Sequence, residues 1–237
     1  MTSTETLVLA GTAATIGLVH TILGPDHYLP FIVLARARRW NSAKTTVITA
    51  LCGLGHVLSS VLLGFTGAAL GIALFKLKAI EAIRSRWAAW FLIAFGLVYF
   101  VWGLRRAFRN RPHEHSHAHE EGGVHAHAHR HTGEHVHVHE SGSVDLTPWV
   151  LFTIFVFGPC EPLIPLVMYP VAQGHVGTAV IVATVFGLAT IMTMLAIVLA
   201  SSFGLARLPL RRLEQYSHAA AGLAILMCGG AIRFLGL

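Results

Sequence analysis

The sequence predicts an all-α polytopic membrane protein with about six transmembrane helices. The chain has 237 residues, of which 54% are hydrophobic and only 12% are charged, whereas a soluble globular domain carries about 25% charged residues. Apolar runs of about 20 residues recur along the chain, and that length spans a bilayer as a helix. The short alternating segments of a membrane β-barrel are not found in the sequence.

The expected spans are residues 6–34, 46–74, 88–106, 147–171, 176–201 and 216–236. The first and fourth spans each contain a helix break, whose residues are Gly24, Pro25, Gly158, Pro159 and Pro162. Proline lacks a backbone donor and clashes with the preceding helical turn. Inside a membrane, such breaks persist only where the freed backbone groups face protein or water. The breaks therefore indicate a functional site.

The two breaks are related by an offset of 134 residues, and the same offset matches Gly53 with Gly187. Because each half holds three spans, the second half must enter the membrane from the opposite side. We expect two inverted three-helix repeats, 1–107 and 147–237, joined by a His-rich loop at 108–146. Inverted repeats with broken helices place a substrate site near the midplane of many transporters.

The lysine and arginine residues predict the orientation. Of these 17 residues, 12 lie in the loops after the first, third and fifth spans, and cytoplasmic loops carry such an excess. We therefore expect a protein of the bacterial inner-membrane type, with both termini outside and the His-rich loop in the cytoplasm. The segment 76–86 is an exception and is expected to form a short interfacial helix. The net charge of +6 thus requires no nucleic-acid partner.

Ionisable side chains inside the spans predict a metal site. An ionisable group there costs about 2.5–3.5 kcal/mol on insertion scales unless it faces a partner or a water-filled cavity. Imidazole nitrogens together with a carboxylate suit Ni²⁺, Co²⁺, Zn²⁺ or Cu²⁺. The predicted metal-site residues are His20, Asp26, His27, His56 and Glu161. The first three are expected to bind the ion, and the other two to complete or gate the site.

Two residues of the second half occupy the repeat positions of first-half site residues. Cys160 matches Asp26 and is either an additional ligand or gate, or a small apolar residue. Thr190 matches His56, and it either lines the pathway or serves helix packing. The chain has three cysteines without paired spacing, so a disulfide framework is not expected.

The loop between the two halves is the second strong metal signal, since it holds 11 of the 16 histidines. Alternating histidines in a polar segment offer many competing sites for transition metals. Without a packed core, we expect the loop to be disordered when no metal is bound. The predicted capture residues are His113, His115, His117, His119, His125, His127, His129, His131, His135, His137 and His139.

Together these features resemble the nickel/cobalt transporters, most closely the NicO branch within the superfamily of lysine-exporter-like membrane proteins. The likeness rests on the pattern His20-x5-Asp26-His27, the second broken helix with Glu161, the six spans and the His-rich loop. The family signature places the first histidine four residues before Asp-His, and here the gap is five.

This resemblance implies a secondary transporter for Ni²⁺ or Co²⁺, with Zn²⁺ or Cu²⁺ as other possible cargoes. A capture loop in the cytoplasm favours export over import. No prosthetic group and no enzymatic activity are expected, and the sequence contains no nucleotide-binding loop. The expected partners are the lipid bilayer and metal ions, with a second copy of the chain or a cytoplasmic metallochaperone as further candidates.

The same superfamily leaves two alternative functions open. One is a membrane thiol–disulfide electron carrier that uses Cys160, although Asp26 replaces the matching cysteine in the first half. The other is an exporter of a sulfur-containing organic anion, which Asp26 and Glu161 would repel.

Overall fold

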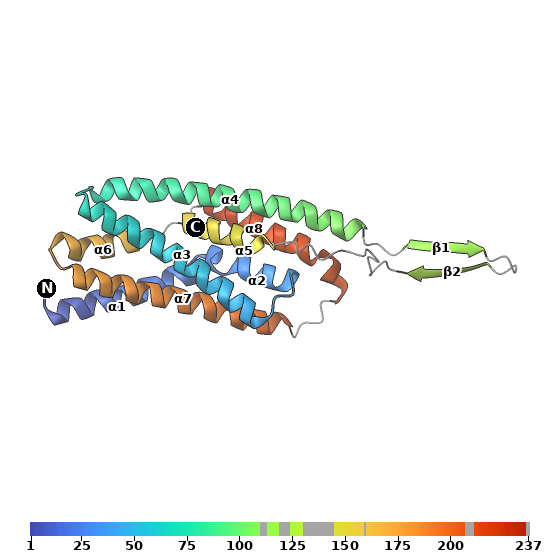
Figure 1. The fold of residues 1–237 in the computed structure, drawn as a ribbon, viewed down its shortest axis with the longest axis horizontal. Coiled ribbons are helices and arrows are strands. Elements are labelled where there is room, and N and C mark those ends of the chain that lie inside the picture. Colours follow the sequence, from blue (N-terminus) through green and yellow to red (C-terminus); the bar gives the residue numbers. More distant parts are fainter. Residues whose placement is uncertain (110–112, 119–123, 130–144, 159, 207–210, 236–237) are drawn as a thin grey trace.

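An elongated bundle of helices makes up most of the protein, and a short hairpin extends beyond one of its ends (Figure 1). The computed structural model describes residues 1–109, 113–118, 124–129, 145–158, 160–206 and 211–235. The helices are α1 (Ser3–Leu23), α2 (Leu29–Ala37), α3 (Ser42–Ala69), α4 (Leu74–Arg109), α5 (Thr147–Phe157), α6 (Leu163–Ala172), α7 (Val176–Ala206) and α8 (Ser217–Leu235). Short 3-10 helices form η1 (Pro25–His27) and η2 (Arg211–Tyr216), and the strands are β1 (His113–Ala118) and β2 (Val124–His129). The all-α class is confirmed for the bundle.

Both predicted helix breaks are present. α1 gives way to η1 at Gly24 and Pro25, and residues 158–162 separate α5 from α6. Pro25 is the first residue of η1, and Pro162 is the N-cap of α6. At the start of a helix, the missing N–H of proline leaves no intrahelical hydrogen bond unmade. Pro159 lies outside the part of the chain that the structure describes.

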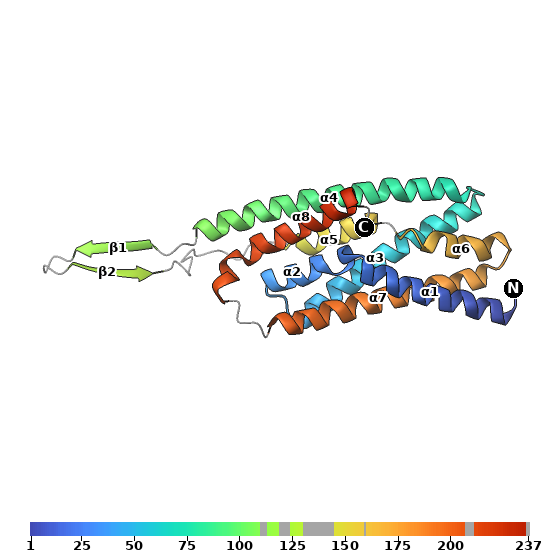
Figure 2. The same cartoon turned by 180° about the vertical axis from the view of Figure 1, so that it is seen from behind.

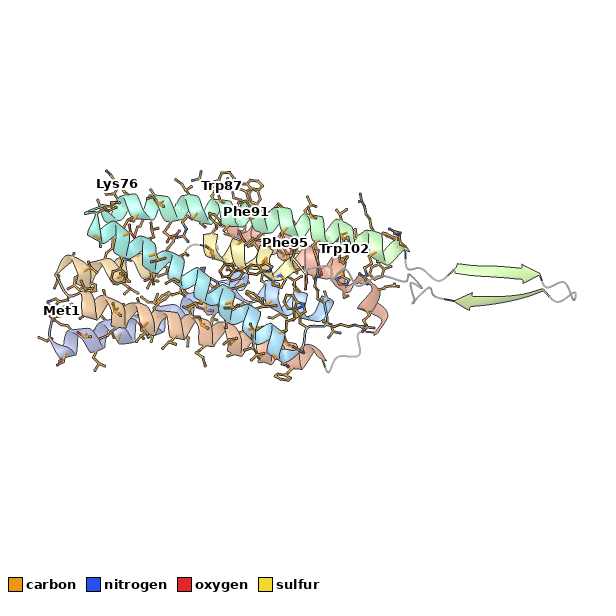
Figure 3. All side chains as sticks on the ribbon, viewed as in Figure 1. Met1, Lys76, Trp87, Phe91, Phe95 and Trp102 are labelled. Atoms are coloured by element: carbon orange, nitrogen blue, oxygen red, sulfur yellow. The ribbon has the colours of Figure 1, made fainter. Side chains whose placement is uncertain are left out.

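The surface of the bundle suits a lipid environment. Five of the described helices, α1, α3, α4, α7 and α8, are long and apolar enough to cross a membrane. Large apolar side chains face outward along them, and Trp87 and Phe91 project from α4 with 57% and 39% of their surface exposed (Figure 3). α5 and α6 have 11 and 10 residues and are each too short to span a bilayer alone. The count of six spans therefore stays a prediction.

α4 is longer than the third predicted span at 88–106, since it runs without interruption from Leu74 to Arg109. The segment 76–86, expected as a separate interfacial helix, forms the first turns of α4 instead. The separate helix was therefore a wrong prediction. No proline interrupts this stretch, and its residues are good helix formers, so the helix continues.

Most of the extensive helix contacts join one half of the chain to the other. α1 lies along α7, whereas α3 contacts α5 and α6. α4 packs along α8, which also contacts α2 (Figures 1 and 2). One cluster of buried side chains includes Phe31, Leu151 and Ile225, and a second includes Cys160 and Phe186. Both helix breaks consequently lie inside the bundle, against helices of the opposite half.

The His-rich loop contains regular structure where the sequence predicted disorder. β1 and β2 pair antiparallel, with His113 opposite His129. Alternation of two residue types has the period of a β-strand, which accounts for the pairing. The strands contain His113, His115, His117, His125, His127 and His129. The other predicted capture residues, His119, His131, His135, His137 and His139, lie outside the described residues.

Asp145 ties the start of α5 to the segment that joins α2 and α3. Its carboxylate accepts hydrogen bonds from Arg38 Nη1 at 2.8 Å, from Lys44 Nζ at 3.4 Å and from the Thr147 amide at 3.2 Å. Burial raises the pKa of Asp145, but the hydrogen bonds from Thr147 and the charge of Arg38 outweigh burial and lower it below its usual value. The stability that this contact supplies is therefore present at neutral pH and lost as the pH falls through the lowered pKa.

Candidate functional site

Three histidines from different segments meet at the first helix break. His20 lies in the last turn of α1, His27 in η1 and His56 in α3, and one ligand atom from each lies within 4.8 Å of the others. The ring centroid of His27 is 4.7 Å from that of His20 and 5.0 Å from that of His56. The Nε2 atom of each ring is buried and has no hydrogen-bond partner among the described residues. Because buried polar atoms normally have partners, the cluster is a candidate ligand site.

His27 is held in place by its own segment. Its Nδ1 lies 3.1 Å from both Asp26 Oδ1 and the Gly24 carbonyl oxygen. A carboxylate behind an imidazole fixes the ring and its tautomer, as in the outer shell of many metal sites. A Cβ atom at Gly24 would lie 2.5 Å from His27 Nδ1, so the glycine of the break is needed for this arrangement.

The second break makes room for His56 in the same way. A Cβ atom at Gly158 would lie 3.0 Å from His56 Nδ1 and 3.1 Å from the Phe155 carbonyl oxygen. Each Gly-Pro break therefore accommodates one histidine of the cluster, and the two breaks are joined through it.

The other predicted site residues differ in their positions. Asp26 contacts His27 and keeps 28% of its side chain exposed. Glu161 is exposed and does not join the histidines, because it follows the buried Cys160 on a tight turn. Thr190 is fully buried, its Oγ1 lacks a hydrogen-bond partner among the described residues, and it packs against α1.

Cys160 is completely buried at the second break, and its amide donates a hydrogen bond to Ser60 Oγ at 3.3 Å. On the same helix as Ser60, Cys52 lies eight residues earlier, which is about 12 Å along an α-helix. A disulfide requires Cα atoms within about 7 Å. Cys160 and Cys52 therefore do not bridge in this conformation, and Cys228 is also free.

A buried ion pair beside Cys160 was not predicted from the sequence. Glu81 is fully buried and accepts a hydrogen bond from Arg84 Nη1 at 2.9 Å. Arg84 Nη2 donates to Ser59 Oγ at 2.7 Å and to the Val156 carbonyl at 2.8 Å. Glu81 is therefore a buried acidic residue of the bundle that the sequence analysis did not assign to a site. The i, i+3 spacing of glutamate and arginine was the signal that could have found the pair.

An apolar groove of about 500 Å³ lies between α1 and the α6 region. Its lining residues are Leu9, Ile16, Pro162, Pro165, Leu166 and Tyr169. Pro162 belongs to the second break and is two residues from Cys160, so the groove borders this break. It does not include the histidine cluster.

Comparison with known proteins gives one family. A family model described as the cytochrome c biogenesis protein transmembrane region matches residues 29–231. No curated protein and no solved structure gives a significant match. The matched region includes His56 and Cys160, but it begins after His20, Asp26 and His27.

The match corrects the function inferred from the sequence. The prediction of a nickel/cobalt transporter of the NicO type is wrong, as are the predicted divalent cargo (Ni²⁺, Co²⁺, Zn²⁺ or Cu²⁺) and its efflux, because the matching family is a thiol–disulfide family of the membrane. The pattern His20-x5-Asp26-His27 that carried the resemblance lies outside the match. Since the match extends over most of the chain, this multi-pass membrane protein belongs to the family of cytochrome c biogenesis transmembrane regions.

Proposed function

We propose that this protein transfers reducing equivalents in the membrane by thiol–disulfide exchange at Cys160, in support of cytochrome c biogenesis. The observation that carries the proposal is the position of Cys160 inside the family match, at the break between α5 and α6. Helix breaks inside a membrane are tolerated where the backbone is buried in protein or lines a water-filled cavity. Cys52 and Cys228 lie instead within continuous helices.

The exchange needs only one thiol on this chain for its electrons and protons to balance. The Cys160 thiolate attacks a disulfide of an acceptor protein, so that one sulfur leaves as a thiolate and a mixed disulfide forms. A thiolate of a dithiol donor protein then attacks the Cys160 sulfur and releases the reduced acceptor. The second donor thiol displaces Cys160 and closes the donor disulfide. Two electrons and two protons have passed from donor to acceptor, and Cys160 is a thiol again.

The exchange requires a conformation other than the one described here. Cys160 is fully buried, and a thiol buried in apolar surroundings is inert. The groove beside Pro162 supports opening between α1 and α6. We infer that movement of α6 about the break at residues 158–162 exposes the thiol to its partners.

The packing of each half against the other supports an arrangement in two inverted repeats. The broken helix of each half lies against the second helix of the other half, and the third helices, α4 and α8, pack together. In this proposal the repeats are 1–107 and 147–237, with six spans. The N-terminus and the hairpin lie at opposite ends of the bundle (Figure 1), and the lysine and arginine excess favours the hairpin end as the cytoplasmic one.

Replacement of Cys160 by serine should abolish the function. In cells of the source strain that lack the gene, the Cys160→Ser chain is expected to leave the yield of c-type cytochromes, measured by haem staining, at the level of the deletion. Serine keeps the size of the side chain but provides no nucleophilic thiolate.

The matched control is Cys52→Ser, which changes another buried cysteine and should restore the yield. Immunoblots must show equal amounts of both variants in the membrane. A normal yield from Cys160→Ser would refute the proposed role of this thiol.

A further inference from the structure

The thiol exchange proposed at Cys160 does not use the histidine cluster, and two of the three histidines precede the region that matches the family. We propose that His20, His27 and His56 bind one copper(I) ion as a resident ion of the protein. This site is distinct from the metal transport excluded above, since the ion is held and not carried across the membrane.

The donor atoms carry the first part of the argument. Three buried Nε2 atoms lack partners among the described residues, and one ligand atom from each ring lies within 4.8 Å of the others. Nitrogen atoms at about 2.0–2.1 Å from a central ion lie about 3.5 Å apart. Small side-chain rotations that move the nitrogen atoms by about 1 Å would therefore bring all three within bonding distance of one ion.

The surroundings of two rings direct their lone pairs toward the centre of the cluster. Asp26 and the Gly24 carbonyl lie on the Nδ1 side of His27. Phe155 and Gly158 lie on the Nδ1 side of His56. When Nδ1 carries the proton, Nε2 is the free electron-pair donor, which is the tautomer that a metal requires.

Charge decides which ion fits best. Imidazole nitrogens suit copper as well as zinc and nickel, so the donor type alone does not choose. Among the ion pairs of the described residues, Asp26 is paired with His27, and Glu81 is neutralised by Arg84. A copper(I) ion would balance the single charge of Asp26, whereas a divalent ion would leave a net positive charge in a buried site, which is costly.

Copper(I) binding to the purified full chain tests the site. The eleven loop histidines are replaced by serine in every variant, to remove competing ligands, and copper(I) is titrated anaerobically against a colorimetric chelator. We expect one copper(I) ion per parent chain. His27→Asn should weaken binding by more than about 100-fold, and Asp26→Asn by about 10–100-fold, the usual effect of removing an outer-shell partner. The matched control His218→Asn lies in α8 and should bind like the parent.

Three results would overturn the site: no tight copper(I) binding by the parent, equal binding by His27→Asn, or tighter binding of Zn²⁺, Ni²⁺ or Co²⁺ than of copper(I). Gel filtration and thermal unfolding establish that each variant folds, and if His27→Asn does not fold, Asp26→Asn decides the question. Cys160→Ser should bind copper(I) normally, so failure of the thiol function and failure of the metal site give different results.

Discussion

Replacing Arg84 by methionine is expected to destabilise the protein by about 3–5 kcal/mol, the usual cost of removing one partner of a buried ion pair. Glu81 is fully buried, and its Oε2 has no partner among the described residues even in the native protein. Without Arg84, its carboxylate would also lose the hydrogen bond at 2.9 Å. The Val156 carbonyl at the end of α5 would lose its donor as well.

The effect of Arg84→Met can be measured by denaturant unfolding of the chain in mixed micelles. Arg86→Met is the matched control, because Arg86 lies two residues further along α4 and is exposed. A second variant, Glu81→Gln with Arg84→Met, should recover part of the loss, since it removes the unpaired charge. Equal destabilisation by Arg84→Met and Arg86→Met would contradict the assigned role of the pair.

Gly222→Ala should separate α4 from α8 and cost about 1–3 kcal/mol, the usual range for overpacking. A Cβ atom at Gly222 would collide with the backbone of Phe100 and lie 2.8 Å from the carbonyl carbon of Tyr99. Backbone atoms have no rotamer through which to move aside, so the helices themselves must shift. Small residues permit this close approach of helices in membrane proteins.

The contact extends along both helices, which is why a single alanine has a large effect. Gly96 and Gly103 of α4 likewise face the backbone of α8, and Gly229 faces α4. Gly230 provides the control, because a Cβ atom there meets nothing within 4 Å, and Gly230→Ala should be neutral or slightly stabilising. Thermal unfolding of the two variants compares them directly. If Gly222→Ala unfolds no earlier than Gly230→Ala, the close packing of α4 and α8 is wrong.

The helix breaks were predictable from the sequence because proline and glycine act locally. Gly24 and Gly158 were correctly placed at the breaks, and the histidines predicted as a set, His20, His27 and His56, do come together. Their assembly also depends on glycines that leave room for two of the rings. That fit depends on how the helices pack in three dimensions. The 134-residue offset between the repeats did not predict it.

Two local misjudgements have physical causes. Glu81 was assigned to an interfacial helix because its neighbours are charged, but Arg84 neutralises it inside the bundle. Glu161 was expected in the site because it follows the break, yet the tight turn that buries Cys160 leaves Glu161 exposed. A prediction from spacing does not determine which of two adjacent turn residues points inward.

The function was mispredicted because a short motif near the N-terminus was given more weight than the rest of the chain, which matches the family. The pattern of His20, Asp26 and His27 is short and easily recognised, whereas the family match extends over residues 29–231 and does not include it. Cys160 was recognised in the sequence, but the lack of a matching cysteine in the first half reduced its weight. Exchange through a mixed disulfide with a partner requires no second cysteine on this chain.

The central claim, exchange at Cys160, is tested most directly by trapping its mixed disulfide. Cells that make a chain whose only cysteine is Cys160, through Cys52→Ser and Cys228→Ser, are quenched with acid, alkylated and run on a non-reducing gel. We expect a band of higher mass that contains the chain, disappears on reduction and is absent from Cys160→Ser. If the Cys160-only chain gives no such band, or if the band persists in Cys160→Ser, Cys160 does not exchange disulfides with a partner.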